Sequence, residues 1–149
     1  MRRWVLGLLA LLSAGPAWAQ GAQGAPPHAW LFGVWTGGMF PAPTHFAPGQ
    51  CVAQATVVFL PDEVRRSVLT QEDMVSRTIE TARATPSGTD FRFAPLPARQ
   101  TPMFGGVAPP TGFGCDSADE LAVQKLGTNE IRFPGCKDFP YPLVRCEMR

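Results

Sequence analysis

Apolar and polar residues alternate most regularly over residues 51–60. There, Val57 and Phe59 fall on one face together with two alanines, and polar side chains fall on the other. A period of two residues is typical of a β-strand with one buried face. Pro61-Asp62 interrupts the pattern, and the β-capable stretch 64–70 follows at once. We therefore predict a strand over 51–60 that forms an antiparallel hairpin with 64–70.

Residues 71–84 fit two patterns. Met74, Val75 and Ile79 could share one face of a helix. Alternatively, a strand over 75–85 could pair with residues 90–94 through a Pro-Ser-Gly turn. The threonines of this stretch favour a strand, so the hairpin is the preferred interpretation and the helix the alternative.

A third hairpin is predicted near the C-terminus. Residues 121–126 and 130–133 are both β-capable, and the turn-forming residues 127–129 separate them. Matching the two strands about this turn places Val123 opposite Phe133. A short final strand over 143–146 follows.

The stretch from Trp30 to Gly38 is the expected centre of the core. It holds Trp30 and Trp35, with Leu31 and Phe32 beside them. Burying these side chains removes a few hundred Å² from water, which at ~25 cal/mol per Å² stabilises the fold by several kcal/mol.

Two long segments rich in proline and glycine, 39–49 and 95–114, show no regular pattern. Proline removes a strand's hydrogen-bond donor, so both are predicted to be loops. We expect Phe40 and Phe46 to fold back on the core. Short strands joined by such loops indicate an all-β fold, either a small antiparallel β-barrel or a sandwich of hairpins.

The N-terminal 19 residues have the features of a secretory signal peptide. Arg2 and Arg3 precede an apolar stretch, and Ala17-Trp18-Ala19 resembles a cleavage site. Residues 20–27 form a leader that we expect to be disordered, and residues 28–149 one β domain. We predict a periplasmic or secreted protein without a transmembrane segment after processing.

The four cysteines form an even set in a chain predicted to be exported, so two disulfides are expected. Cys115 and Cys136 flank the open end of the third hairpin and could bridge it, leaving Cys51 to pair with Cys146. The competing arrangement joins Cys136 to Cys146 and Cys51 to Cys115. The sequence does not separate these possibilities.

The net charge of the chain does not indicate any particular class of binding partner. Removing Arg2 and Arg3 reduces the 13 basic residues to 11, against 12 acidic residues, so the processed chain has a formal charge of −1. The basic residues are scattered rather than clustered, which argues against nucleic-acid binding.

Sequence motifs for catalysis and for cofactor binding are missing. No nucleophile, zinc-protease or phosphate-loop motif is present, and the cysteines lack zinc-site spacing. We expect no metal and no cofactor. His28 and His45 are interpreted as solvated loop residues. Carboxylate pairs at 62–63, 72–73 and 119–120 are interpreted as charged strand ends, with acid–base chemistry or cation binding as the alternative.

Six arginines alternate with apolar residues on the predicted strands: Arg65, Arg66, Arg77, Arg83, Arg92 and Arg132. Together they could form a receptor for a carboxylate, a phosphate or an acidic protein surface. The favoured interpretation is a solvated outer face with cross-strand pairs to Glu80, Asp90 and Glu130. Arg66 and Arg92 are the candidates for binding.

The tripeptide Gly33-Val34-Trp35 resembles the Gly-x-Trp signature of calycin-type barrels, which include lipocalins, avidins and small bacterial protease inhibitors. In those families the tryptophan closes the bottom of the barrel. The resemblance covers this tripeptide alone. It implies either a small apolar ligand inside the barrel or a partner protein at its mouth.

The favoured hypothesis is an exported, non-catalytic binding module. One version binds a protein, for example an exported hydrolase that it inhibits, through Phe46 and Phe104 in the long loops. The other carries a small apolar ligand in a cavity of at least ~300 Å³ beside Trp35. The alternative is an exported enzyme that uses a carboxylate and an arginine.

Overall fold

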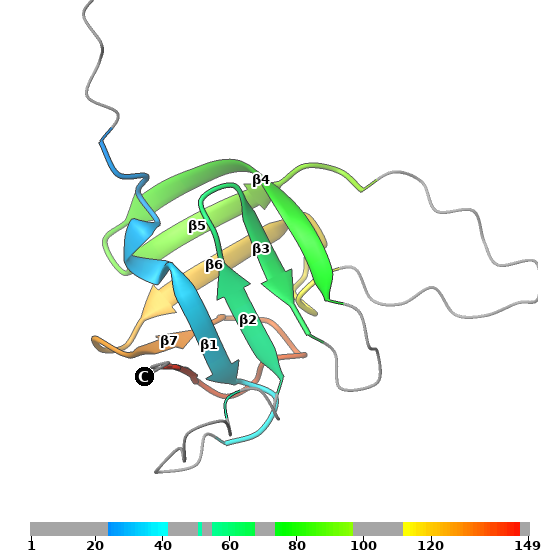
Figure 1. The fold of residues 1–149 in the computed structure, drawn as a ribbon. Helices are drawn as coiled ribbons and strands as arrows, with labels where there is room; N and C mark the ends of the chain where they lie inside the picture. The colour runs from blue at the N-terminus through cyan, green and yellow to red at the C-terminus, as the bar shows by residue number, and fades with distance from the viewer. Residues whose placement is uncertain (1–23, 42–50, 52–54, 68–73, 97–111, 147–149) are drawn as a thin grey trace, which may run out of the picture.

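The chain forms a closed barrel of eight antiparallel strands that follows a short 3₁₀ helix (Figure 1). This computed structural model describes residues 24–41, 51, 55–67, 74–96 and 112–146. The elements are η1 (Ala29–Leu31), β1 (Gly33–Gly37), β2 (Thr56–Phe59), β3 (Glu63–Arg66), β4 (Val75–Thr85), β5 (Gly88–Phe93), β6 (Glu120–Lys125), β7 (Glu130–Arg132) and β8 (Leu143–Arg145). The predicted all-β class is confirmed, and a barrel is found rather than a sandwich.

Every strand pairs with the next one along the chain, and the last strand pairs with the first. In β1, Thr36 lies opposite Thr56 of β2 on one side and opposite Val144 of β8 on the other. The sheet therefore closes on itself and has no terminal strand.

The three predicted hairpins are present, as β2–β3, β4–β5 and β6–β7. Gln124 lies opposite Arg132. Extended by one residue, this register places Val123 opposite Phe133, as predicted. From residue 75 onward the helical alternative for 71–84 is wrong, because β4 occupies 75–85. β2 is shorter than the predicted strand and begins at Thr56, while Cys51 has 3₁₀ conformation.

The two ends of the barrel differ in how the strands are joined. At one end, here named the closed end, lie η1 and the short β2–β3, β4–β5 and β6–β7 turns (Figure 1). The other end is here named the loop end. The strands joined by the longer connections meet there: β1 and β2, β3 and β4, β5 and β6, and β7 and β8. The described ends of the two predicted Pro/Gly loops, 39–41, 95–96 and 112–114, lie at the loop end, and the rest of both segments lies outside the described residues.

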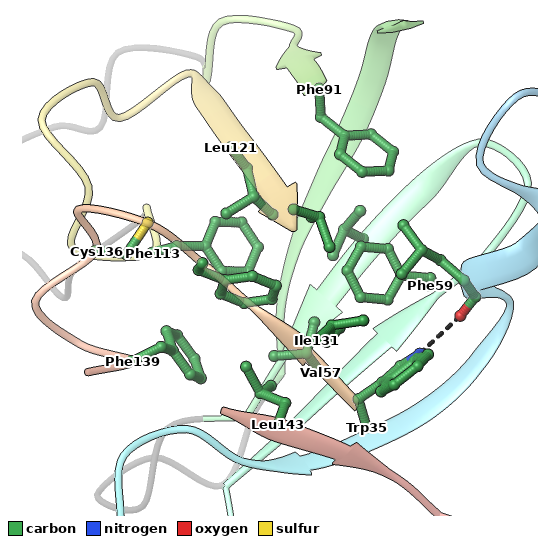
Figure 2. Packing of buried hydrophobic residues seen from close by; sticks show 14 of the residues in the cluster. Trp35, Val57, Phe59, Phe91, Phe113, Leu121, Ile131, Cys136, Phe139 and Leu143 are labelled. Atoms are coloured by element: carbon green, nitrogen blue, oxygen red, sulfur yellow. Dashed lines mark hydrogen bonds between the residues drawn. The ribbon is translucent and has the colours of Figure 1, made fainter. Parts of the chain in front are cut away.

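Aromatic side chains fill the barrel (Figure 2). Phe91 and Phe93 stack with their rings 6.2 Å apart, and Phe93 stacks on Phe113 at 5.7 Å. The other large members of the core are Leu31, Trp35, Phe59, Leu121, Ile131, Phe133, Phe139 and Leu143. An eight-stranded barrel is just wide enough to be filled by side chains, and here it is filled by phenyl rings.

Two disulfides, Cys51–Cys146 and Cys115–Cys136, fasten the chain. They confirm the first of the two predicted arrangements. Disulfides of this kind form and persist outside the cytosol, which indicates a non-cytoplasmic location. In the described part of the chain, no helix has the length and apolar character needed to cross a membrane.

Candidate functional site

Trp35 lies inside the barrel toward the closed end and is completely buried. Its indole Nε1 donates a hydrogen bond to the carbonyl oxygen of Leu31 at 2.7 Å, the contact drawn as a dashed line in Figure 2. Leu31 belongs to η1, so this bond joins the helix to the first strand. The side chain is therefore part of the core and is not available to a partner.

Arg145, at the end of β8, covers the indole of Trp35. Its guanidinium carbon lies 4.3 Å from the ring centroid, close enough for a cation–π interaction. Two guanidinium nitrogens also donate to the carbonyl oxygens of Phe32 and Trp30, at 2.7 and 2.6 Å. One side chain thus ties the last strand to η1 and seals this end of the barrel.

The space beside Trp35 is occupied by the side chains of Val57, Phe59, Ile131 and Leu143 (Figure 2). These are all buried, and the two hollows described below lie on the outside of the barrel. The packed interior therefore gives the carrier hypothesis no support.

The interpretation of His28 as a solvated residue is wrong, because only 3% of it is exposed. Its Nε2 donates to the carbonyl oxygen of Pro61 at 3.2 Å, and its ring meets Phe32 and Phe91 edge-on. His28 thus fills the closed end under the β2–β3 turn. We find no role for it as a general base.

Arg66 is not on the outer face, contrary to the prediction. It is 97% buried at the loop end, and its Nη1 donates to Asp138 Oδ2 at 2.8 Å. The guanidinium also lies 5.8 Å from the ring of Phe113 and 5.9 Å from that of Phe139. Because Arg66 is buried and its charge is compensated by the partly exposed Asp138, it is not placed to receive an external anion.

Arg77 is the second arginine that the fold buries, with no exposed surface. It forms an ion pair with Asp119, donates to the carbonyl oxygens of Ala118 and Ala94, and lies 5.1 Å from the ring of Phe93. Asp119 belongs to a predicted carboxylate pair, and its role here is to hold the β5–β6 connection against β4.

The other four arginines lie outside the barrel, as the favoured interpretation predicts. Arg92 pairs with Glu80 at 3.4 Å, and Arg132 donates a hydrogen bond to the side-chain oxygen of Gln124. Arg65 contacts Glu63. Hydrogen bonds from Ser76 and Arg65 lower the pKa of the Glu63 carboxyl below its usual value of 4.5.

A hollow of about 740 Å³ crosses the outside of β4, β5 and β6. Its charged lining consists of Glu80, Arg83, Asp90, Arg92 and Glu120. The one ion pair recorded there, Arg92–Glu80, is exposed by 66% and 53% at its two side chains. Water reaches these groups freely, so the hollow lacks the exclusion of solvent that makes a carboxylate and an arginine effective in catalysis.

Exposed apolar side chains mark the loop end instead. Of the four large hydrophobic residues exposed in the described part of the chain, Phe40, Met74 and Tyr141 flank loop-end connections, and Leu126 lies at the closed end. Phe40 is 62% exposed, so the expectation that it folds back on the core is wrong. The sequence does not indicate that Phe40 and Tyr141 are exposed, because nothing in a Pro-rich segment distinguishes an exposed aromatic residue from a buried one.

The remaining predicted anchors, Phe46 and Phe104, lie outside the described residues, as does His45. Among the residues that are described, no group of three or more His, Cys, Asp or Glu side chains could hold a metal ion. Comparisons with protein-family models, with curated proteins and with solved structures gave no match.

Proposed function

We propose that the protein is an exported, non-catalytic binding module that recognises a protein partner at its loop end. The observation that carries the proposal is the position of Phe40 and Tyr141, two exposed aromatic residues on adjacent connections. Large aromatic side chains of this kind commonly supply most of the binding energy at protein interfaces.

The backbone around these two residues is held in place. Tyr141 N donates to the carbonyl oxygen of Gly38 at 2.9 Å, and Gly38 N donates to that of Pro142 at 3.2 Å. Pro41 and Pro140 further restrict the chain on either side. Because less conformational entropy is lost when a rigid surface binds, this arrangement favours affinity.

The class of partner is suggested by the calycin resemblance. Gly33-Val34-Trp35 begins β1, and Trp35 is buried toward the closed end. Among the barrels that share this tripeptide, the small bacterial protease inhibitors bind a protein. Binding a protein suits a packed interior better than carrying a small ligand does. An exported hydrolase is therefore the proposed partner, met in the periplasm or after secretion.

The test compares capture of partners by four forms of the disulfide-bonded protein. Wild type, Phe40→Ala and the Phe40→Ala/Tyr141→Ala double variant are immobilised and exposed to the exported proteins of the source organism. The control is Leu126→Ala, which removes an apolar side chain of similar exposure, 43%, at the closed end. Hydrolase activity is then assayed with and without the purified module.

We expect a hydrolase that wild type and Leu126→Ala retain and inhibit alike, with at least ~10-fold weaker binding by the double variant, as expected for two central aromatic residues. Equal binding by the double variant would show that the loop end is not the interface. A retained protein without hydrolase activity would overturn the inhibitor assignment alone.

A further inference from the structure

A second hollow, of about 460 Å³, lies at the closed end, opposite the proposed protein-binding surface. Three segments that are distant in the sequence line it: Trp30 of η1, residues 85–88 where β4 turns into β5, and residues 125–127 at the end of β6. Figure 1 shows η1 beside the β4–β5 turn, and the hydrogen bond from Trp30 to β5 confirms that contact. Its volume is in the range of small-molecule sites.

Trp30 is held as a fixed wall of this hollow. Its indole Nε1 donates to Thr89 Oγ1 at 3.1 Å, and its carbonyl oxygen accepts a hydrogen bond from Arg145 at 2.6 Å. The side chain is only partly buried. An aromatic surface that is anchored at two points and still reachable is preorganised to receive the apolar face of a ring.

Lys125 brings a positive charge to the same wall. Its Nζ lies 5.3 Å from the centroid of the Trp30 ring, and its backbone nitrogen is fixed by a hydrogen bond to Ser87 O at 2.8 Å. Within the described residues, no carboxylate lies within ion-pair distance of Lys125, and none lines the hollow. The charge therefore remains available to a ligand.

Polar groups complete the lining. The hydroxyls of Thr85 and Ser87 point to no partner among the described side chains, and each can both donate and accept a hydrogen bond. A ligand that matches all these features has an apolar ring face, hydroxyl groups around its rim and one negative charge.

From this lining we propose that the hollow binds an acidic saccharide. One face of the sugar ring lies on Trp30, its carboxylate pairs with Lys125, and its hydroxyls bond to Thr85 and Ser87. The site is independent of the loop end, so it can be present whether or not the protein binds a hydrolase.

The test is a titration of the full disulfide-bonded protein, followed by amide chemical shifts and calorimetry. The probes are galacturonic acid and its trimer, with maltotriose as the neutral counterpart and sodium sulfate as the simple anion. A shallow site of this size predicts a Kd on the order of 1 mM. Comparing the affinities for the monomer and the trimer shows whether the site binds a free sugar or a sugar unit within a polysaccharide.

The variants are Lys125→Gln, Trp30→Ala and, as the matched control, Lys137→Gln, an exposed lysine at the loop end. We expect galacturonate binding that is at least ~10-fold weaker in Lys125→Gln, unchanged in Lys137→Gln and suppressed by salt. If Trp30→Ala fails to fold, the Lys125→Gln variant still tests whether the site binds galacturonate. No binding at ~10 mM, equal binding of maltotriose, or equal shifts with sulfate alone would overturn the proposal.

Discussion

At the scale of single residues, the most informative positions are the two buried arginines. In β3, Val64 and Arg66 are buried while Arg65 between them is exposed. In β4, Arg77 lies between the inward-facing Val75 and Ile79. The period of two therefore places both arginines inside the barrel, and only the chemical expectation that arginine is exposed argues otherwise. Asp138 and Asp119 compensate their charges from distant connections, and no sequence pattern indicates these two ion pairs.

Asp138→Asn removes the charge that compensates Arg66. We expect it to lower the free energy of unfolding by about 2–4 kcal/mol, because an uncompensated buried guanidinium remains. Urea denaturation of wild type and variant measures the change. Glu80→Gln is the control, since it breaks an exposed ion pair and should change stability by less than ~1 kcal/mol. If Asp138→Asn and Glu80→Gln have equal effects, Asp138 does not compensate Arg66.

At the scale of elements, the longest strand owes its shape to one irregularity. The register of β4 against β5 shifts between Ile79 and Thr81. Before the shift Arg77 faces inward, and after it Ala82 faces inward while Arg83 faces outward. A β-bulge inserts one residue and reverses which side chains point inward. Alternation alone would have placed Arg83 inside.

Gly88 shows how closely β5 approaches β6. A Cβ atom at this residue would lie 1.9 Å from the carbonyl oxygen of Val123, which is backbone and cannot move away. We expect Gly88→Ala to destabilise the fold by ~2 kcal/mol or more, as overpacking does. Gly127→Ala is the matched control, because a Cβ there would meet only the side chain of Glu130 at 3.9 Å. Thermal unfolding that shows equal changes for both variants would contradict this account.

Local patterns predicted the hairpins well and the segments outside them poorly. The strands around 57, 75–85 and 121–126 follow from alternation and turn residues, which act over a few positions. The burial of His28 and the exposure of Phe40 depend instead on which distant segments cover them. Trp35, predicted as a ligand-binding residue, was correctly placed in the core, but only the barrel shows that core side chains surround it. The candidate sites at Tyr141 and Lys125 arise from contacts between turns and have no sequence motif.

At the scale of the whole molecule, the two disulfides constrain the chain over very different lengths. Cys115–Cys136 spans 21 residues near the loop end, whereas Cys51–Cys146 spans 95 residues and ties β8 to the segment that leads into β2. The shorter link holds Asp138 and Phe139 close to Phe113, so it also supports the surroundings of Arg66.

Replacing each cysteine pair by alanines should destabilise the protein to different extents. In the chain-entropy description, the 21-residue link contributes about 3 kcal/mol and the 95-residue link about 5 kcal/mol. Denaturant titrations of the two double variants and the wild type measure both values. If the Cys115/Cys136 variant proves the less stable one, local packing around Arg66 outweighs loop entropy.

The pairing of β8 with β1 has a consequence for biosynthesis. Synthesis proceeds from the N-terminus, so β1 has only β2 to pair with until residues 143–145, which form β8, have been made. Until then two strand edges stay open to other chains, and such edges promote aggregation. A chain that lacked residues 143–145 would leave the edges of β1 and β7 unpaired, and it would therefore be prone to pair with strands of other molecules.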